Sequence, residues 1–409
     1  MRWNNKGVDS TNLRISNNFM SGGKLERIAA YLCPQGNPSN FIISGGMCGD
    51  EKYQSIYPVL DNMMGKYPII VLHNNDRYME KMLIQLWENR ENEKIPYWLV
   101  NQSINKFEPF YGMAEMQIIT IFRQLARKLD YKITPKFEKV IRAHIFILKQ
   151  LKIAVSLSGF YYLCSFLDMG EFHDNIMQLS CDEKTAQRIW TDMGVNEEDN
   201  QFDLFRTVVN NLAFDASYNG WNPDNSIDEI NCIQAIKNNA VLSIAINDMH
   251  TNLLFSYFSE EFRANRYPFI LILDGIKITD QQFVEYLING NSGCFCGIIT
   301  PNIAELFEDN ENKFSQLMER INCFVIFKHS TGRAATIISE ILGKYDYIKV
   351  EKSEGEGKKF FDFLPNSTHK DTRYTMENRY RVMPEEITSL KPKQAIIFDT
   401  LSDQIIHYN

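Results

Sequence analysis

The chain of 409 residues is 44% hydrophobic and 12% aromatic, a composition that supports a large buried core and excludes wholesale disorder. Its 43 basic residues against 51 acidic ones give a net charge of −8, which argues against a surface coated with positive charge for duplex DNA. No apolar run of about 18 residues occurs, so the sequence predicts no membrane-spanning helix, and its first residues lack the apolar core of a secretory signal.

Eight short apolar runs predict buried strands. The runs are continuous rather than alternating, which is the pattern of strands covered on both faces. In chain order they are Asn40–Ser44, Pro68–Leu72, Ala240–Ile246, Pro268–Leu273, Phe295–Thr300, Cys323–Phe327, Tyr347–Val350 and Ala395–Phe398.

Helix-like segments lie between several of these strands. Asp280–Ile288 follows one strand, and Ala334–Leu342 follows another and is closed by Gly343. Pro384, followed by two glutamates, marks a further helix start because proline and acidic residues suit a first turn. This alternation predicts an α/β domain with a mostly parallel sheet.

The stretch 111–230 breaks the alternation and has a helical pattern throughout. Two apolar stripes with helical spacing run through it, namely Ile118, Phe122, Leu125 and Leu129, and then Val140, His144, Ile147 and Leu151. We therefore expect an all-α insertion at 111–230 that separates two parts of the α/β domain, residues 1–110 and 231–409.

A glycine-rich loop follows the first predicted strand, with the sequence Gly45-Gly-Met-Cys-Gly-Asp-Glu-Lys52-Tyr53. A loop of this kind between a strand and a helix holds phosphate when backbone N–H groups surround the oxygens. A lysine then reaches the β- and γ-phosphates, and a Ser or Thr hydroxyl binds magnesium. The motif of such a loop can be aligned with its first glycine at Gly45 or at Gly46, and neither alignment is intact.

If the phosphate motif begins at Gly45, acidic residues take the positions of its second glycine and its lysine. If it begins at Gly46, Lys52 keeps the lysine position, but Glu51 replaces the second glycine and Tyr53 replaces the magnesium-binding hydroxyl. Carboxylates at short range repel a triphosphate. A strand-to-helix turn without a ligand therefore competes with a nucleotide site at this loop.

The second half of a nucleotide site is expected at the end of another buried strand, where Asp274 and Gly275 follow Pro268–Leu273. In an ATPase the first acid arranges magnesium and a neighbouring residue activates water, but Gly275 carries no acid–base group. An aspartate in this position also serves as a turn or cap residue. The candidate nucleotide site, in degenerate form, consists of Gly45, Gly46, Gly49, Lys52 and Asp274.

A basic window lies in the helical stretch, where residues 123–152 carry nine Lys and Arg against Asp130 and Glu138. Its aromatic residues offer rings for stacking on single-stranded bases, and they are Phe122 at the edge, Tyr131, Phe137 and Phe146. A pair of amphipathic helices with a solvated basic face is the competing interpretation. The candidate nucleic-acid or partner patch is Arg123, Arg127, Lys128, Lys132, Lys136, Lys139 and Arg142.

No catalytic residue and no metal site is predicted, because the seven histidines and eight cysteines show no ligand spacing and no nucleophile motif is present. The close pair Cys294 and Cys296 is expected as buried thiols on a strand, in a reducing cytosolic compartment. His144 lies on an apolar stripe and is expected to be a hydrogen-bonded core residue. The polar stretch Glu351–Thr372 is expected to be a mobile surface loop, and Arg333 is expected as a solvated arginine at a helix start.

The carboxy-terminal third carries motifs of a known family. Ser330–Gly343 ends in S-x-x-L-G, and Arg379–Ile397 contains a Pro-Glu-Glu-Ile segment that closes on Gln-Ala-Ile-Ile. Together with the glycine-rich loop, the helical insertion and the strand that ends in an aspartate, these motifs resemble the type IV secretion coupling proteins. That family is the conjugative branch of the FtsK–HerA class of hexameric P-loop motors.

The resemblance implies a RecA-like, mostly parallel sheet with an inserted all-α domain. It implies ATP with Mg²⁺ as a ligand, a homo- or hetero-hexamer, and partners among secretion or conjugation proteins or an active motor paralogue, in the cytoplasm and at the membrane through such partners. Because the motif positions at Glu51, Tyr53 and Gly275 depart from the family, we expect a degenerate member with weak or no ATPase, acting as a substrate receptor or scaffold. An active DNA or protein translocase that uses Lys52, and a module that binds single-stranded nucleic acid, are the alternatives.

Overall fold

The structure is a computed structural model. It describes residues 25–46, 50–74, 77–90, 93–100, 106–129, 132–166, 168–179, 181–195, 201–213, 229–246, 248–264, 267–278, 281–288, 293–306, 316–356 and 368–408. Gly49 of the candidate nucleotide site lies outside these residues.

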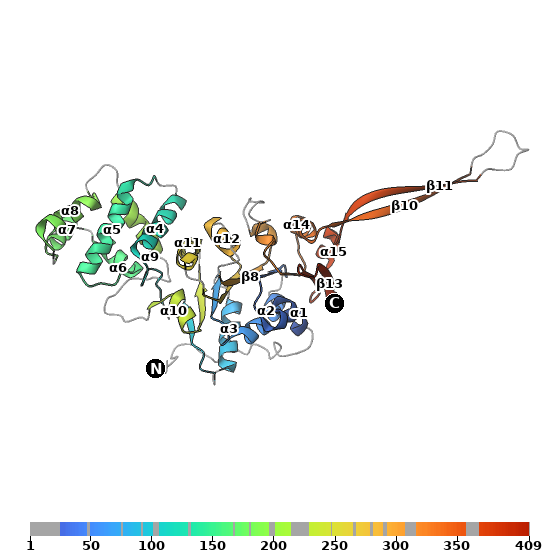
Figure 1. The fold of residues 1–409 in the computed structure, drawn as a ribbon, viewed down its shortest axis with the longest axis horizontal. Coiled ribbons are helices and arrows are strands. Elements are labelled where there is room, and N and C mark those ends of the chain that lie inside the picture. Colours follow the sequence, from blue (N-terminus) through green and yellow to red (C-terminus); the bar gives the residue numbers. More distant parts are fainter. Residues whose placement is uncertain are drawn as a thin grey trace, which may run out of the picture.

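A nine-stranded sheet forms the centre of the molecule (Figure 1), with the spatial order β13-β12-β9-β1-β8-β7-β2-β6-β3. Neighbouring strands from β9 to β3 pair in parallel, whereas β12 runs antiparallel to both β9 and β13. The strands are β1 (Phe41–Ser44), β2 (Ile69–His73), β3 (Tyr97–Val100), β6 (Val241–Ala245), β7 (Phe269–Asp274), β8 (Cys294–Thr300), β9 (Cys323–Ile326), β12 (Ala395–Asp399) and β13 (Gln404–Tyr408).

Helices cover both faces of this sheet, which explains why its strands are continuously apolar. Phe41 and Ile43 of β1 face one core and Ile42 faces the other. The first core is completed by α1 (Leu25–Leu32), α2 (Asp50–Met63) and α3 (Arg77–Asn89). The second core is completed by α10 (Cys232–Lys237), α11 (Asp248–Ala264), α12 (Gln281–Ile288), α14 (Gly332–Leu342) and, at the β12 end, α15 (Pro384–Ser389).

Between β4 (Lys106–Phe107) and β5 (Glu229–Ile230), which pair with each other, the described elements are all helices. Gln117 and Gln124 of the first of these helices donate side-chain hydrogen bonds to Glu260 of α11, so the helical part packs directly on the α/β part. The helices are α4 (Glu115–Lys128), α5 (Pro135–Gln150), α6 (Leu157–Cys164), α7 (Met169–Met177), α8 (Glu183–Met193) and α9 (Gln201–Ala213).

A buried carboxylate stands where the chain enters the helical part. Glu108 follows β4, is 2% exposed, and accepts hydrogen bonds from the backbone N–H of Leu157 at 2.8 Å to each carboxylate oxygen. It also accepts the N–H of Phe110 at 3.1 Å. Glu108 thus satisfies the first N–H group of α6, which the helix itself leaves unpaired, and ties it to the chain next to β4.

Most predicted strands are confirmed, but the two ends of the sheet and one hairpin differ from the sequence expectations. The strands β3 and β13 were not among the predicted runs. The predicted strand Tyr347–Val350 lies outside the central sheet, in the antiparallel hairpin of β10 (Lys344–Glu356) and β11 (Thr368–Tyr380). The prediction of a loop at Glu351–Thr372 is therefore wrong for 351–356 and 368–372, because a ladder of backbone hydrogen bonds holds these charged residues extended.

Candidate functional site: a glycine turn, a lysine and a buried aspartate

The candidate nucleotide-site residues in the described part of the chain lie at the carboxyl ends of the parallel strands. Gly45 and Gly46 follow β1, Asp274 is the last residue of β7, and Lys52 lies in the first turn of α2. Ligands of open α/β sheets bind at this edge, outside the carboxyl ends of the strands. The fold thus brings residues more than 200 positions apart in the sequence to one place.

Gly45 and Gly46 form a turn that the sheet itself requires. Both have positive φ, +89° and +84°, a conformation that L-residues with side chains rarely adopt. The N–H of Gly45 donates to the carbonyl of Thr300 and that of Gly46 to the carbonyl of Lys328, at 3.0 and 3.1 Å. A Cβ at Gly45 would lie 2.7 Å from the carbonyl oxygen of Phe327. These glycines are therefore explained by strand packing, without a ligand.

Lys52 and Tyr53 both contact Asp274. The Lys52 ammonium lies 3.6 Å from Asp274 Oδ1 and 4.5 Å from the centroid of the Tyr53 ring. The Tyr53 hydroxyl donates a hydrogen bond of 2.9 Å to Asp274 Oδ2. Tyr53 and Asp274 are each 1% exposed. This geometry matches the register that begins at Gly46, in which Lys52 takes the lysine position and Tyr53 the hydroxyl position.

These residues do not fit a magnesium–triphosphate complex. Mg²⁺ takes carboxylate, phosphate and water oxygens in an octahedral shell, whereas the Asp274 oxygens are engaged by a phenol and an ammonium group. In the sequence, Glu51 takes the position of the motif's second glycine, where a carboxylate repels a triphosphate. Gly275 supplies no side chain, and its N–H donates to the carbonyl of Ile299. The arrangement instead holds the start of α2 onto the end of β7.

Two buried histidines border the site and were not singled out from the sequence. His329 Nε2 lies 3.0 Å from Ser44 Oγ, at the end of β1, and burial lowers the pKa of His329 to about 4, so its ring is neutral at pH 7. His73 pairs with Asp274 in the strand register, and its Nε2 lies 3.1 Å from Ser243 Oγ. The available signal was their position: His73 directly follows one predicted apolar run, and His329 lies two residues after another.

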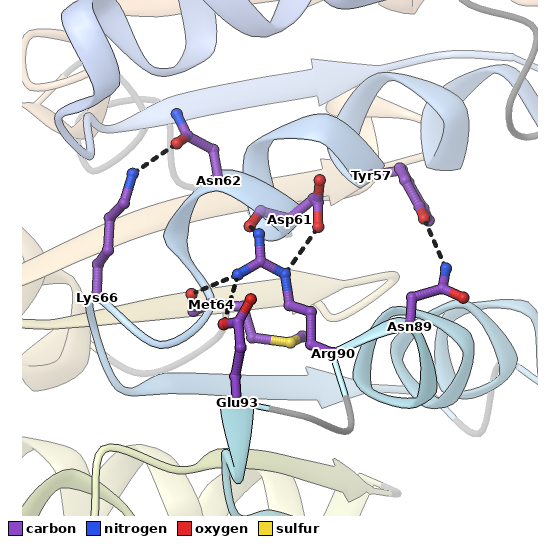
Figure 2. A network of polar contacts seen from close by, with 8 residues as sticks. All are labelled: Tyr57, Asp61, Asn62, Met64, Lys66, Asn89, Arg90 and Glu93. Atoms are coloured by element: carbon purple, nitrogen blue, oxygen red, sulfur yellow. Dashed lines mark hydrogen bonds and ion pairs between the residues drawn. The ribbon is translucent and has the colours of Figure 1, made fainter.

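The far end of α2 is fixed by a separate polar network, shown in Figure 2. Arg90, just after α3, pairs with the Asp61 carboxylate through Nε at 3.0 Å and also donates to the carbonyl oxygens of Asp61 and Met64. Its Nη1 pairs with Glu93 at 2.9 Å. Carbonyls at a helix end lack partners within the helix, so Arg90 caps α2. The helix is therefore held at both ends.

The candidate basic patch is more neutral in the structure than in the sequence window. Arg123 pairs with Glu138 at 2.6 Å, and Arg142 pairs with Glu115. Lys139 lies 3.6 Å from Asp192. Glu115 and Asp192 lie outside the window in the sequence. Arg127, Lys128, Lys132 and Lys136 are exposed.

The aromatic part of that hypothesis is wrong for two residues. Phe122 and Phe137 are fully buried and pack with Phe205 in an aromatic cluster, so neither can stack on a base. His144 packs against Phe205 and pairs through Nδ1 with the carbonyl of Val140 at 2.7 Å, whereas its buried Nε2 has no hydrogen-bond partner among the described residues. The expected core histidine is therefore only half satisfied.

Several other expectations concern single residues or absences. Cys296 is buried and Cys294 partly buried on β8, and Arg333 is exposed in the first turn of α14. Within the described ranges, no group of three or more His, Cys, Asp or Glu side chains is arranged to hold a metal ion. In the same part of the chain, no helix combines the length and the apolar character needed to cross a bilayer.

The sheet order, with helices on both faces and the turn after β1 beside the aspartate at the end of β7, defines a RecA-like α/β fold. Solved structures of the bacterial conjugative coupling protein TrwB share it. The unbound form has 11% identity and a TM-score of 0.51, covering 88% of this chain and 81% of that one. The sulphate complex has 10% identity and a TM-score of 0.53, covering 90% and 85%.

A further TrwB structure, in complex with the non-hydrolysable ATP analogue ADPNP, has 10% identity and a TM-score of 0.51, covering 90% of this chain and 84% of that one. No protein-family model matches the sequence, and no curated protein matches it. The chain thus has the fold of the type IV coupling proteins, as the sequence motifs suggested.

Proposed function

We propose that this chain is a coupling-protein-like component of a conjugative or type IV secretion system, with a degenerate P-loop and weak or no ATPase activity. It acts as a substrate receptor or scaffold in the cytoplasm, associated with the membrane through its partners. The fold shared with TrwB supports the class. Tyr53 at the position of the magnesium-binding hydroxyl and Gly275 at the position of the second acid support a role as receptor or scaffold without ATP hydrolysis.

One observation carries this proposal. The Tyr53 hydroxyl, at the position of the magnesium-binding hydroxyl, is hydrogen-bonded to Asp274 at 2.9 Å, and Lys52 lies 3.6 Å from the same carboxylate. Asp274 and Tyr53, at the magnesium-binding positions, and Lys52, at the phosphate-binding position, are thus engaged with one another through the Asp274 carboxylate. Opening them to admit a ligand would leave a carboxylate that is 1% exposed without its partners, which is costly.

We further propose that the partners are other secretion or conjugation proteins or an active motor paralogue, in a homo- or hetero-oligomeric ring. TrwB has been solved in complex with a non-hydrolysable ATP analogue, so a mixed ring with a TrwB-like paralogue would combine a nucleotide-binding subunit with this chain. In such a ring this chain would contribute its helical part and surfaces rather than hydrolysis.

Turnover of Mg-ATP by the purified chain tests the proposal, with Asp274→Ala as the matched variant. We expect phosphate release at the background rate for both proteins. Robust hydrolysis by the wild type that is abolished in Asp274→Ala would overturn the proposal of weak or no ATPase activity, because Asp274 is the acid that would arrange magnesium.

The second candidate function is an active ATP-driven DNA or protein translocase, and it is favoured by the convergence of Lys52 and Asp274 at 3.6 Å. In that case Lys52→Ala lowers the affinity for ATP. Titration calorimetry of the wild-type chain with Mg-ATP decides the question, because the absence of binding heat removes this candidate.

The third candidate is a nucleic-acid-binding module, favoured by the exposed basic side chains of α4 and α5. Electrostatic binding of this kind weakens steeply as salt rises. Charge reversal of Lys132, Lys136 and Lys139 should abolish binding of single-stranded DNA at low salt if the patch is the site. Binding that survives the reversal excludes it.

A further inference from the structure

The hairpin of β10 and β11, which we name the arm, extends away from the body beyond the β13 end of the sheet (Figure 1). Its two strands of 13 residues pair at every position, from Lys344–Tyr380 to Glu356–Thr368, a ladder of about 40 Å at about 3.4 Å per residue. Two-stranded hairpins are marginally stable alone in water, and their outer edges carry unpaired backbone groups. An arm of this length is therefore expected to lie against another surface.

The base of the arm fixes its direction. Arg381, directly after β11, pairs with the Asp403 carboxylate and donates through Nη2 to the Asp403 carbonyl at 2.8 Å. Its guanidinium lies 5.6 Å from the ring centroid of Phe398 in β12, and the backbone N–H of Arg381 donates to the carbonyl of Gly343 at 2.9 Å. The arm is thus anchored to the β12–β13 end of the sheet.

Exposed apolar side chains concentrate on this part of the molecule. In the described part of the chain, ten large apolar or aromatic side chains are well exposed, and half of them belong to the arm or its base. They are Tyr345, Tyr347 and Met376 on the arm, and Met383 and Leu401 at the base. Concentrations of this kind mark interaction surfaces.

Both faces of the arm carry such residues. Tyr345 and Tyr347 lie on one face, where the Arg379 guanidinium stands 4.1 Å from the Tyr347 ring centroid and pairs with Glu377 at 2.8 Å. Met376, which is 70% exposed, lies on the other face because neighbouring strand positions alternate. Tyr, Met and Arg are enriched at the cores of protein–protein interfaces.

The charge of the arm indicates the kind of partner. Its strands hold six basic and six acidic residues and have no net charge, in a chain of −8. A neutral arm gains little from the phosphates of a nucleic acid, and it can approach a second acidic copy without the repulsion that the rest of the chain would meet. Its 26 strand residues also equal the number that one side of a stable protein interface contributes, about 20–30.

We infer that the arm docks on a second copy of this chain and links copies together. This inference does not rest on the state of the nucleotide site, so the two fail separately. Self-association as such rests on the oligomeric ring of the proposed function, whereas the difference between the arm variant and the wild type tests the arm. Mg-ATP turnover tests the nucleotide site.

Sedimentation velocity of the full chain over a range of concentrations tests the inference, with a triple variant Tyr345→Ser, Tyr347→Ser and Met376→Ser. We expect the wild type to self-associate and the triple variant to do so at least about tenfold more weakly, because exposed aromatic anchors dominate such interfaces. A matched control replaces three other well-exposed side chains elsewhere, and it should associate as the wild type does. The control is Tyr111→Ser, Leu151→Ser and Tyr267→Ser.

A wild type that stays monomeric, an arm variant that associates as tightly as wild type, or a control that is weakened equally would each overturn the inference. A photo-crosslinking residue in place of Met376 gives a second readout that does not depend on the triple variant. Covalent dimers of this chain are expected. Crosslinks to DNA or to other proteins alone, in a cell extract, would overturn the second copy as the partner.

Discussion

The hydrogen bond between Tyr53 and Asp274 makes a measurable prediction about stability. Tyr53→Phe removes one hydroxyl and leaves the ring in place, so the change isolates the bond of 2.9 Å to a carboxylate that is 1% exposed. Hydrogen bonds to charged groups contribute about 1.5–3 kcal/mol. Since Lys52 remains 3.6 Å from the other oxygen, we expect the free energy of unfolding to fall by about 2 kcal/mol.

Urea unfolding followed by circular dichroism measures this change. Tyr267→Phe is the matched control, because Tyr267 is 38% exposed and loss of a surface hydroxyl changes stability by less than about 0.5 kcal/mol. If Tyr53 were a magnesium-binding residue instead, Tyr53→Phe would weaken Mg-ATP binding and leave the free chain as stable as before. A Tyr53→Phe protein within about 0.5 kcal/mol of wild type would refute the structural role of this bond.

Three further predictions concern other parts of the structure. Gly45→Ala should lower the free energy of unfolding by at least about 2 kcal/mol, because of its positive φ and its contact with a neighbouring carbonyl. Gly112→Ala, at a positive φ with nothing within 4 Å, should cost less in the same urea titration. Glu108→Ala removes the carboxylate that accepts the N–H groups of Phe110 and of Leu157 at the start of α6. It should lower the melting temperature by an amount corresponding to about 3 kcal/mol, and an unchanged melting temperature would contradict that role. Burial lowers the pKa of His144 and His329 to about 4. Between pH 6.5 and 4 the unfolded chain therefore binds more protons than the folded chain, and the free energy of unfolding decreases as the pH is lowered. The loss from pH 7 to pH 5 should be about 2 kcal/mol per histidine, and His144→Phe should remove its share; an equal pH slope in the variant would contradict this.

The central sheet was largely predictable because its strands are buried on both faces. Phe269–Asp274 is apolar up to its final aspartate, and Gly343 ends α14 at a φ of +86°. Local sequence carries this information, since burial and turn chemistry act residue by residue. The outer strands β3 and β13 were missed because they are less completely buried, and their apolar signal is correspondingly weaker.

The candidate site was predictable in its components but not in its contacts. The residue types at Gly46, Lys52 and Asp274 indicated a nucleotide-type turn, but only the fold shows that Tyr53 reaches Asp274, which lies 221 positions further along the chain. The pair Ser44 and His329 is separated by 285 positions. No spacing rule connects residues on different strands, so such contacts require the strand order.

Charge and exposure in the two polar regions also depended on tertiary contacts. Counting charges within residues 123–152 missed Glu115 and Asp192, which neutralise Arg142 and Lys139 from other helices. The stretch Glu351–Thr372 was predicted to be a loop because its charged residues carry no burial signal. A hairpin exposed on both faces has the same composition as a loop, and its backbone pairing is what distinguishes it.

An experimental structure of the chain determined with ADPNP and Mg²⁺ tests the account most directly. The account predicts no triphosphate at the turn after β1, with the Tyr53–Asp274 hydrogen bond intact and Lys52 beside the same carboxylate. A triphosphate and magnesium held between Lys52 and Asp274, with the Tyr53 side chain displaced, would contradict it.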